Sequence, residues 1–412
     1  MPELFRVVEH TVNCSHSREY VGATANGDAD RPQLAVKQYI PLDNLNPQPG
    51  DVTIIGAHAN GFPKELYEPL WDELYPRLTK SGIRIRSIWI ADMWNQGQSG
   101  VLNEKILGND PSWWDHTRDL ANLINQKRDE MPHPLVGIGH SMGGAQLTLL
   151  ALGNPRLLHS LVLIDPVIQT AITGIEPAAA STRRRDLWDS RAAAAAKFRQ
   201  SKFYQTWDPR VLDLWVRHGL RDLPTALYPQ PPSSSGKPKG GDGPVTLATT
   251  KHQEVFTFLR PTYRGAGTDL RDRDPNLEGA QKYPSFYRPE PPHAFLRLPE
   301  LRPGVLYVFG GKSDMSTPEA RRIKMERTGT GVGGSGGAVA RRVREEVLDC
   351  GHLVAMERVS ECAEAVAGFL KGEVALWQRE AAEAEEERRS RRERGEVAKI
   401  DERWNSELKA KM

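Results

Sequence analysis

Short apolar runs alternate with amphipathic stretches in the first half of the chain. Four runs are largely continuous, which is typical of strands buried on both faces of a parallel sheet. They span residues 52–55, 83–90, 135–138 and 161–164. Stretches with helical periodicity separate them, and the clearest runs from Ser112, a good N-cap residue, to about Glu130. This alternation predicts right-handed crossover connections and an α/β fold with a mostly parallel central sheet flanked by helices.

The pattern changes on both sides of this region. Residues 5–14 and 33–40 alternate with period two, which predicts a pair of antiparallel strands. After residue 166 the regular alternation stops until about residue 300. Helical periodicity in this part covers 190–206, 209–219 and 247–259. We therefore predict a helical lid with an apolar underside, inserted between the sixth and seventh core strands.

The α/β pattern resumes after residue 300. Strands at 305–309 and 342–348 enclose a helix at 317–326, and an amphipathic helix follows at 359–370. The chain is thus predicted to have four parts. These are the first part of the core (1–166), the lid (167–300) with a mobile Pro-, Ser- and Gly-rich insertion (229–244), the second part of the core (301–372) and a charged helical tail (373–412).

Composition and charge argue against several classes of function. The 412 residues suffice for one large α/β domain with an insertion, or for two domains. A formal net charge of +2 gives no indication of nucleic acid or a membrane surface as a partner. Three scattered cysteines are too few for a disulfide framework or a zinc site, and no apolar run is long enough to span a membrane. The sequence therefore predicts no metal, no other cofactor and no transmembrane segment.

The candidate chemistry centres on Gly139-His140-Ser141-Met142-Gly143. This G-x-S-x-G pattern follows a predicted strand and precedes a predicted helix, the context in which a nucleophilic serine stands on a sharp turn. Glycines flank such a turn because strand and helix approach so closely that no side chain fits between them. Ser141 would lie at the amino end of a helix, whose dipole favours developing negative charge. We predict Ser141 as the nucleophile.

His352 and two aspartates are the candidates for the other members of a catalytic triad. A serine hydroxyl needs a base to accept its proton, and the base needs an acid to orient it. His352 follows the last predicted strand, where its imidazole can reach back over Ser141. Asp314 follows the strand at 305–309, the usual place for the acid, whereas Asp165 ends the strand after the nucleophile helix. Strand order favours Asp314, but Asp165 can contact the same imidazole, and both stay open.

Two backbone donors are needed to stabilise an oxyanion during acyl transfer. The N–H of Met142, the residue after the predicted nucleophile, is the first. The second comes from the loop after the strand at 52–55, where either Phe62 or Asn60 would supply it. His58, in the same loop, is predicted to brace the loop by hydrogen bonds.

Longer strings in the chain resemble a known family, the fungal peroxisomal α/β-hydrolases. These strings are His-Ala-Asn-Gly-Phe-Pro-Lys-Glu-Leu-Tyr-Glu-Pro-Leu-Trp (58–71), Asn-Gln-Gly-Gln-Ser-Gly (95–100), Asn-Asp-Pro-Ser-Trp-Trp-Asp-His (109–116) and Gly-His-Ser-Met-Gly-Gly (139–144). The family includes a peroxisomal lipase, hydrolases of toxin biosynthesis and the type I acyl-CoA thioesterase of mycophenolic acid biosynthesis. The resemblance implies the α/β-hydrolase fold, with Ser141 as nucleophile, His352 as base and Asp165 as acid.

The resemblance and the predicted triad together imply a serine hydrolase that cleaves an acyl-CoA thioester, fatty or polyketide-derived, through an acyl-serine intermediate. The alternative is a lipase or esterase that uses the same triad on a carboxylic ester. A non-catalytic ligand-binding protein would need a broken triad, which the sequence does not show. Basic residues at the start of the lid are interpreted either as contacts to CoA phosphates or as a solvated helix face. They are Arg183, Arg184, Arg185, Arg191, Lys197 and Arg199.

The tripeptide Ala410-Lys411-Met412 is a variant of the Ser-Lys-Leu signal that the peroxisomal import receptor reads. Together with the resemblance, it predicts this receptor as a partner and the peroxisomal matrix as the compartment, with the cytoplasm as the alternative. The other predicted partner is a small-molecule acyl substrate. The sequence is also compatible with a homodimer.

Overall fold

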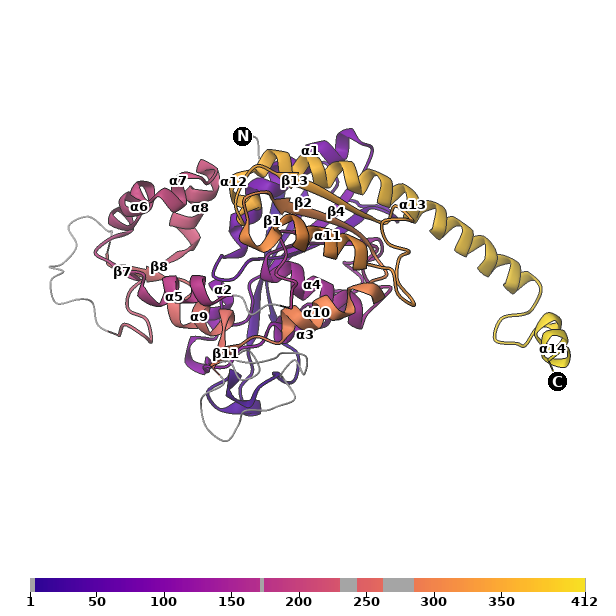
Figure 1. Cartoon of the computed structure of the whole chain (residues 1–412), viewed down its shortest axis with the longest axis horizontal. Helices are drawn as coiled ribbons and strands as arrows, with labels where there is room; N and C mark the ends of the chain where they lie inside the picture. Colours follow the sequence, from indigo (N-terminus) through magenta and orange to yellow (C-terminus); the bar gives the residue numbers. More distant parts are fainter. Residues whose placement is uncertain (1–3, 171–173, 230–242, 262–284, 412) are drawn as a thin grey trace.

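The computed structural model, which describes residues 4–170, 174–229, 243–261 and 285–411, is built on an eight-stranded sheet. Its strands are β1 (Phe5–Asn13), β2 (Gln33–Pro41), β3 (Val52–Ala57), β4 (Ile85–Ala91), β5 (Leu135–His140), β6 (Ser160–Ile164), β12 (Gly304–Gly310) and β13 (Val343–Leu348). They are arranged in the order β1-β2-β4-β3-β5-β6-β12-β13. β2 pairs antiparallel with β1 and β4, and the remaining neighbours are parallel, which confirms the predicted α/β sheet (Figure 1).

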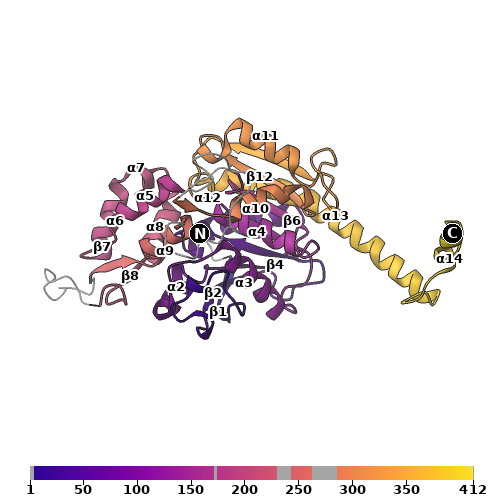
Figure 2. The ribbon, with the colours of Figure 1, turned by 60° about the horizontal axis from the view of Figure 1, so that its bottom comes forward.

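Helices cover both faces of this sheet because its inner strands are apolar on both faces. In β3, Ile54 shares a hydrophobic cluster with α1 (Glu68–Lys80) and α13 (Val359–Glu393). The next residue, Ile55, belongs to a second cluster on the opposite face. That face is covered by α3 (Trp113–Gln126), α4 (Met142–Gly153) and α10 (Glu290–Arg297), as Figure 2 shows. Burial on both faces explains why the apolar runs are continuous and not alternating.

The start of α3 is as predicted, whereas the loop before it contains an additional helix. Ser112 Oγ accepts a hydrogen bond from the N–H of Trp114, and the Asp115 carboxylate accepts one from the N–H of Ser112, so the two residues form a capping box. The connection from β4 to α3 includes the short helix α2 (Gly97–Leu102). Its two glycines disfavour a helix in isolation, and buried contacts with β2 stabilise it here.

The segment between β6 and β12, the sixth and seventh strands of the sheet in chain order, is mixed and not purely helical. Its helices are α5 (Ile175–Arg183), α6 (Arg191–Gln200), α7 (Lys202–Gln205), α8 (Pro209–His218) and α9 (Lys251–Phe258), followed by α10. Between them β7 (Leu187–Trp188), β9 (Val245–Leu247) and β8 (Leu220–Asp222) form a small antiparallel sheet. The helix expected to start at residue 247 therefore starts at Lys251, and the expected mobile insertion at 229–244 lies mostly outside the described residues.

An aromatic cluster joins this segment to the core. Trp207 and Trp215 lie 5.5 and 6.0 Å from Phe62, measured between ring centroids, and Tyr204 and Phe198 extend the cluster within the segment. Phe62 belongs to the loop after β3, which the sequence predicts to face the candidate nucleophile. The two tryptophans thus pack the segment against the loop of Phe62, and its role as a lid stays a prediction.

The charged tail begins inside a helix and not after one. α13 continues through the boundary expected at residue 373 as far as Glu393, and it leaves the body of the molecule along its second half (Figures 1 and 2). Glu–Arg pairs one turn apart, such as Glu387 with Arg391 at 2.7 Å, accompany its exposed part. A short helix, α14 (Glu402–Lys409), follows. Among the described residues, no helix combines the length and apolarity that crossing a membrane requires.

Candidate active site

Ser141 occupies a strained turn between β5 and α4. Its backbone has φ 56° and ψ −117°, a conformation that residues with a side chain seldom adopt, and its N–H donates to the carbonyl of Ile164 over 2.9 Å. A Cβ on Gly143 would collide with the carbonyl oxygen of Ala57, and one on Gly139 would lie 2.6 Å from the carbonyl oxygen of Gly143. The two glycines of the motif are therefore required by the close approach of β3, β5 and α4.

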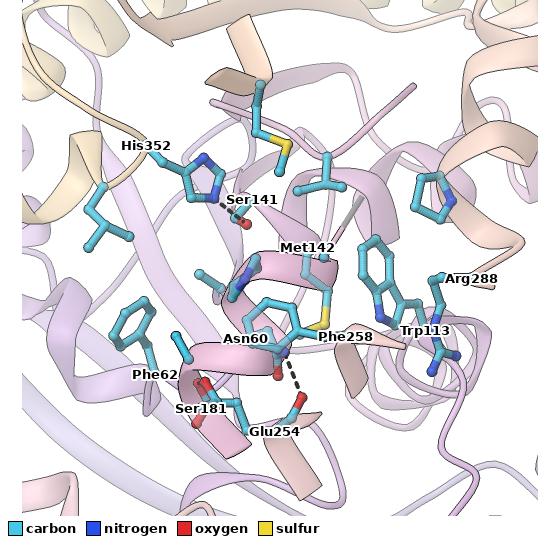
Figure 3. A pocket seen from close by; sticks show the side chains of 18 of the residues that line it. Asn60, Phe62, Trp113, Ser141, Met142, Ser181, Glu254, Phe258, Arg288 and His352 are labelled. Atoms are coloured by element: carbon cyan, nitrogen blue, oxygen red, sulfur yellow. Dashed lines mark hydrogen bonds between the residues drawn. The ribbon is translucent and has the colours of Figure 1, made fainter. Parts of the chain in front are cut away.

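Ser141, His352 and Asp165 form a continuous hydrogen-bonded series. Ser141 Oγ lies 2.8 Å from His352 Nε2, as the dashed line in Figure 3 marks. His352 Nδ1 lies 2.6 Å from Oδ2 of Asp165, a carboxylate that is fully buried at the end of β6. Because the carboxylate holds the proton of Nδ1, the lone pair of Nε2 is directed at the serine hydroxyl. This arrangement can accept the serine proton.

The two candidate acids occupy different environments. Asp165 accepts hydrogen bonds from the N–H of Gly310 at 3.0 Å and from the hydroxyls of Ser313 and Ser316 at 2.5 Å each, in addition to His352. Asp314 is exposed, in the turn that carries these two serines. The loop after β12, in which the acid was expected, thus supplies two hydrogen-bond donors to Asp165. These donors were not predicted from the sequence. The serines on either side of Asp314 were the available signal.

Hydrogen bonding decides the charge of Asp165. Burial works against its charged form and would raise the pKa, but the hydrogen bonds from His352, Ser313 and Ser316 outweigh burial, and the pKa lies below its ordinary value. Asp165 therefore remains a carboxylate at neutral pH.

Among residues 59–62 of the loop after β3, one backbone N–H is left without an acceptor in the described residues. The N–H of Ala59 donates to Tyr67 Oη at 2.8 Å, that of Gly61 to Gln96 Oε1 at 2.7 Å and that of Phe62 to the carbonyl of Ala59 at 3.2 Å. The N–H of Asn60 has no acceptor within the described residues. Of the two predicted second donors, Asn60 is therefore the one whose N–H is free to bind an oxyanion.

Side chains fix the position of this loop. Asn60 accepts from Gln96 Nε2 at 2.7 Å and donates from its Nδ2 to the carbonyl of Glu254 at 3.0 Å. His58 accepts from the N–H of Met93 and donates to the carbonyl of Ala59, each at 2.8 Å, which confirms its predicted bracing role. The N–H of Met142, the first predicted donor, is at the start of α4, where no intrahelical acceptor exists.

His140, which precedes Ser141, connects this loop to the loop of His352. Its Nε2 lies 3.0 Å from the carbonyl oxygen of His352, so Nε2 carries the proton and donates it. Its Nδ1 then accepts from the hydroxyl of Tyr67 at 3.0 Å, and Tyr67 in turn accepts from the N–H of Ala59. Burial lowers the pKa of His140 to about 3, and the nearby His352 adds to this shift. A neutral imidazole therefore links both loops to the end of β5.

Comparison with known proteins agrees with this geometry. The family model described as "Alpha/beta hydrolase family" matches residues 54–367. The chain belongs to this family. It is also 41% identical over 392 residues to the type I acyl-CoA thioesterase mpaH' of Penicillium brevicompactum, an alignment that covers 90% of this chain and 89% of the relative.

Other similar proteins extend the comparison. The thioesterase mpaH of the same fungus is 39% identical, with coverage of 99% of this chain and 96% of the relative. The abhydrolase domain-containing protein ACTT2-1 of Alternaria alternata is 30% identical over 60% of this chain and 87% of the relative. Among solved structures, the peroxisomal α/β-hydrolase Lpx1 of Saccharomyces cerevisiae superposes with a TM-score of 0.63 at 18% identity, covering 89% of this chain and 88% of Lpx1. The protein is therefore a hydrolase enzyme with an α/β-hydrolase fold.

A cavity of about 480 Å³ opens onto Ser141 and His352 in this hydrolase. Its lining is mostly apolar and combines core residues with residues of the segment between β6 and β12. Phe62, Trp113, Met142 and Phe258 are among them (Figure 3), and Phe203 and Pro291 also line the cavity. Its size is typical of small-molecule sites. No group of three or more His, Cys, Asp or Glu side chains suited to a metal ion occurs in the described parts of the chain.

The basic residues at the start of the segment have different surroundings. Arg184 lines the cavity and lies 2.6 Å from Glu254. Arg191 pairs with Asp222 at 3.0 Å, and Arg199 pairs with Asp213 at 3.6 Å. Arg183, Arg185 and Lys197 are exposed. A role of this group in binding CoA phosphates stays a prediction.

Replacing Ser313 or Ser316 with alanine is expected to raise the pKa of Asp165, because burial then meets less compensation from hydrogen bonds. The charged carboxylate contributes stability that is lost as pH falls through its folded-state pKa, so in either variant this loss begins at a higher pH. Each variant should also lose about 2 kcal/mol of unfolding free energy at neutral pH. Urea unfolding measured at a series of acidic and neutral pH values reports both effects.

Thr317→Ala is the matched control for these variants. Thr317 lies in the same loop and accepts from the N–H of Ala320 at 3.3 Å, so its loss removes a helix cap of about 1 kcal/mol. It makes no hydrogen bond to Asp165. A loss of stability in acid that begins at an equally raised pH in Thr317→Ala and in the serine variants would contradict the assigned role of the two hydroxyls.

Proposed function

We propose that this hydrolase cleaves acyl-CoA thioesters through an acyl-Ser141 intermediate. The observation that carries the proposal is the series Ser141–His352–Asp165, with donor and acceptor atoms 2.6 to 2.8 Å apart at the wall of an apolar cavity. The choice of a thioester is supported by the relatives of 39% and 41% identity, which are named as type I acyl-CoA thioesterases. An apolar cavity suits the acyl group.

In the proposed reaction, Ser141 Oγ attacks the thioester carbonyl carbon while its proton passes to His352 Nε2. Asp165 stabilises the imidazolium, and the N–H groups of Met142 and Asn60 bind the oxyanion. The C–S bond then breaks, and His352 returns the proton to the leaving sulfur, which departs as the free thiol. Water next attacks the acyl-serine with the same base, which releases the carboxylic acid and restores the hydroxyl.

We further propose that the hydrolase acts in the peroxisomal matrix. The support is the tripeptide Ala410-Lys411-Met412, of which Met412 lies outside the described residues. A fluorescent fusion that retains the tripeptide should colocalise with a peroxisomal marker, whereas an otherwise identical fusion without it should not.

The proposed reaction is tested with a panel of acyl-CoA thioesters that differ in chain length and bulk. Release of free thiol, followed with a disulfide reagent, is expected for several members. The matched oxygen esters of the same acids distinguish a thioesterase from an esterase, and kcat/KM should be at least tenfold higher for the thioesters. Turnover of the oxygen esters without any turnover of acyl-CoA would refute the thioester proposal and leave an esterase.

A further inference from the structure

One end of the cavity is closed by buried side chains. Trp113, the first residue of α3, and Arg288, which precedes α10, both line the cavity and are 3% and 4% exposed. Figure 3 shows Trp113 and Arg288 near one another, on the other side of Ser141 from His352 and Phe62. We call this part of the cavity its closed end.

The exposed members of the lining lie at a different end, in the segment between β6 and β12. They are Thr170, Pro177, Ala180 and Phe203. Phe203 is 52% exposed, and its ring lies 5.7 Å from that of Trp207, which lies 5.5 Å from that of Phe62. The cavity therefore opens to solvent on the side of Phe62. A leaving group as large and polar as CoA extends from the cavity through this opening.

The chemistry of the triad gives the same orientation for the substrate. In the proposed reaction His352 returns its proton to the leaving sulfur, so the sulfur lies on the side of Ser141 where His352 stands. The carbonyl oxygen of the thioester faces the N–H groups of Met142 and Asn60. The acyl chain, the remaining substituent of the carbonyl carbon, then points away from His352. It enters the closed end.

Trp113 is a fixed wall of this closed end. Its indole Nε1–H donates to the carbonyl of Thr257 over 2.8 Å, and its backbone N–H donates to Glu290 Oε1 over 2.8 Å. Glu290 is fully buried, and Arg288 Nη1 donates to the same Oε1 at 3.3 Å. Three elements, α3, α9 and α10, thus meet at the indole. A side chain held by such contacts in a close-packed interior does not swing aside for a longer ligand.

We propose that Trp113 limits the length of the acyl chain that the hydrolase accepts. The indole contacts the end of the chain once the chain fills the closed end. A further methylene must then displace a fixed ring, which is overpacking, or draw the thioester carbonyl away from Ser141. This inference rests on the proposed acyl-CoA hydrolysis and names the residue that determines its range of substrates.

The test measures kcat/KM against chain length for the wild type and for Trp113→Ala. One series consists of saturated acyl-CoA thioesters from butanoyl to octadecanoyl, and a second of phenylalkanoyl thioesters of increasing length. In the wild type, kcat/KM should rise to a maximum and then fall. In Trp113→Ala the maximum should move to chains longer by about two carbons or more, and kcat/KM for these chains relative to the wild-type optimum should rise roughly tenfold or more, because each buried methylene contributes about fourfold.

Two further substitutions are controls. Trp114→Ala removes the adjacent tryptophan, which packs against His293 at 5.3 Å between ring centroids and does not line the cavity. Its chain-length profile should equal that of the wild type. Phe203→Ala alters the open side of the cavity and should leave the position of the maximum unchanged.

Trp113→Phe keeps a ring and opens less space, so its maximum should move in the same direction by a smaller amount. It decides the test if Trp113→Ala does not fold, and labelling of Ser141 by a fluorophosphonate reports folding of each variant. A wild-type kcat/KM that never falls with length, or an unchanged maximum in labelled Trp113 variants, would overturn the inference and leave acyl-CoA hydrolysis intact. A maximum that moves in Phe203→Ala instead would place the acyl chain at the opening and also overturn it. Absence of turnover of every acyl-CoA by the wild type would overturn the proposed function.

Discussion

Replacing Ser141 with alanine is expected to lower kcat by about a million-fold while the protein remains folded. The hydroxyl is the only group of the hydrogen-bonded series that would form a covalent bond to the acyl carbon. Its loss leaves His352 without a proton to accept from the enzyme. The residual rate would come from the oxyanion donors and from binding. Free-thiol release from the best acyl-CoA substrate measures the effect.

Ser160→Ala provides the matched control. Ser160 is a buried serine at the opposite end of the neighbouring strand β6, and its hydroxyl has no hydrogen-bond partner in the described residues. This variant should retain activity, and both variants should unfold at the wild-type temperature. Substantial thiol release by Ser141→Ala at an unchanged unfolding temperature would disprove the acyl-serine mechanism.

Asp165→Asn is expected to lower kcat by about ten thousand-fold. The carboxylate holds the Nδ1 proton of His352, at 2.6 Å, whereas an amide that donates from its nitrogen would favour the other tautomer. Nε2 would then carry a proton and could not accept the one from Ser141. The amide would also face the hydroxyls of Ser313 and Ser316, so some loss of stability is expected in addition.

Asp314→Asn is the matched control for Asp165→Asn, because it alters the other candidate acid. Asp314 is exposed and near in sequence to the same serines, so its variant should keep kcat within about twofold of the wild type and the same pH profile. Thermal unfolding of both variants separates loss of chemistry from loss of fold. A large loss of kcat in Asp314→Asn with little change in Asp165→Asn would reverse the assignment of the acid.

Local sequence pattern was sufficient to predict most of the sheet. Strands such as β3 and β5 are buried on both faces, so their apolar runs are continuous and easily recognised. The turn at Ser141 was predictable because close approach of a strand and a helix leaves room only for glycine at residues 139 and 143. These features depend on residues that are close in sequence, so they can be predicted from local sequence patterns.

Features that depend on distant contacts were not predictable in the same way. The loop after β12 encloses the carboxylate of Asp165 and leaves that of Asp314 exposed. Strand order alone had favoured Asp314 as the acid. Asn60 differs from Phe62 as a donor only because a turn within the loop engages the N–H of Phe62. Neither contact changes the pattern of apolar and polar residues from which the elements were predicted.

The segment between β6 and β12 was described least well by its sequence. Strands β7 and β8, of two and three residues, are too short for alternation to be visible. They form because β9 pairs with both of them. At the other end of the chain, the Glu- and Arg-rich composition predicted a helical tail but not its fusion with α13, since no residue near 373 ends the helix.

The neutral state of His140 has a consequence for the protein in acid. An exposed histidine in the unfolded chain takes up a proton near pH 6.5, whereas burial lowers the pKa of His140 to about 3 in the folded protein. Between these values the unfolded chain binds one proton more than the folded protein does. The free energy of unfolding therefore falls by about 1.4 kcal/mol for each pH unit of acidification, from this residue alone. The link that holds the two loops in place thus also limits how acidic a compartment the folded enzyme tolerates.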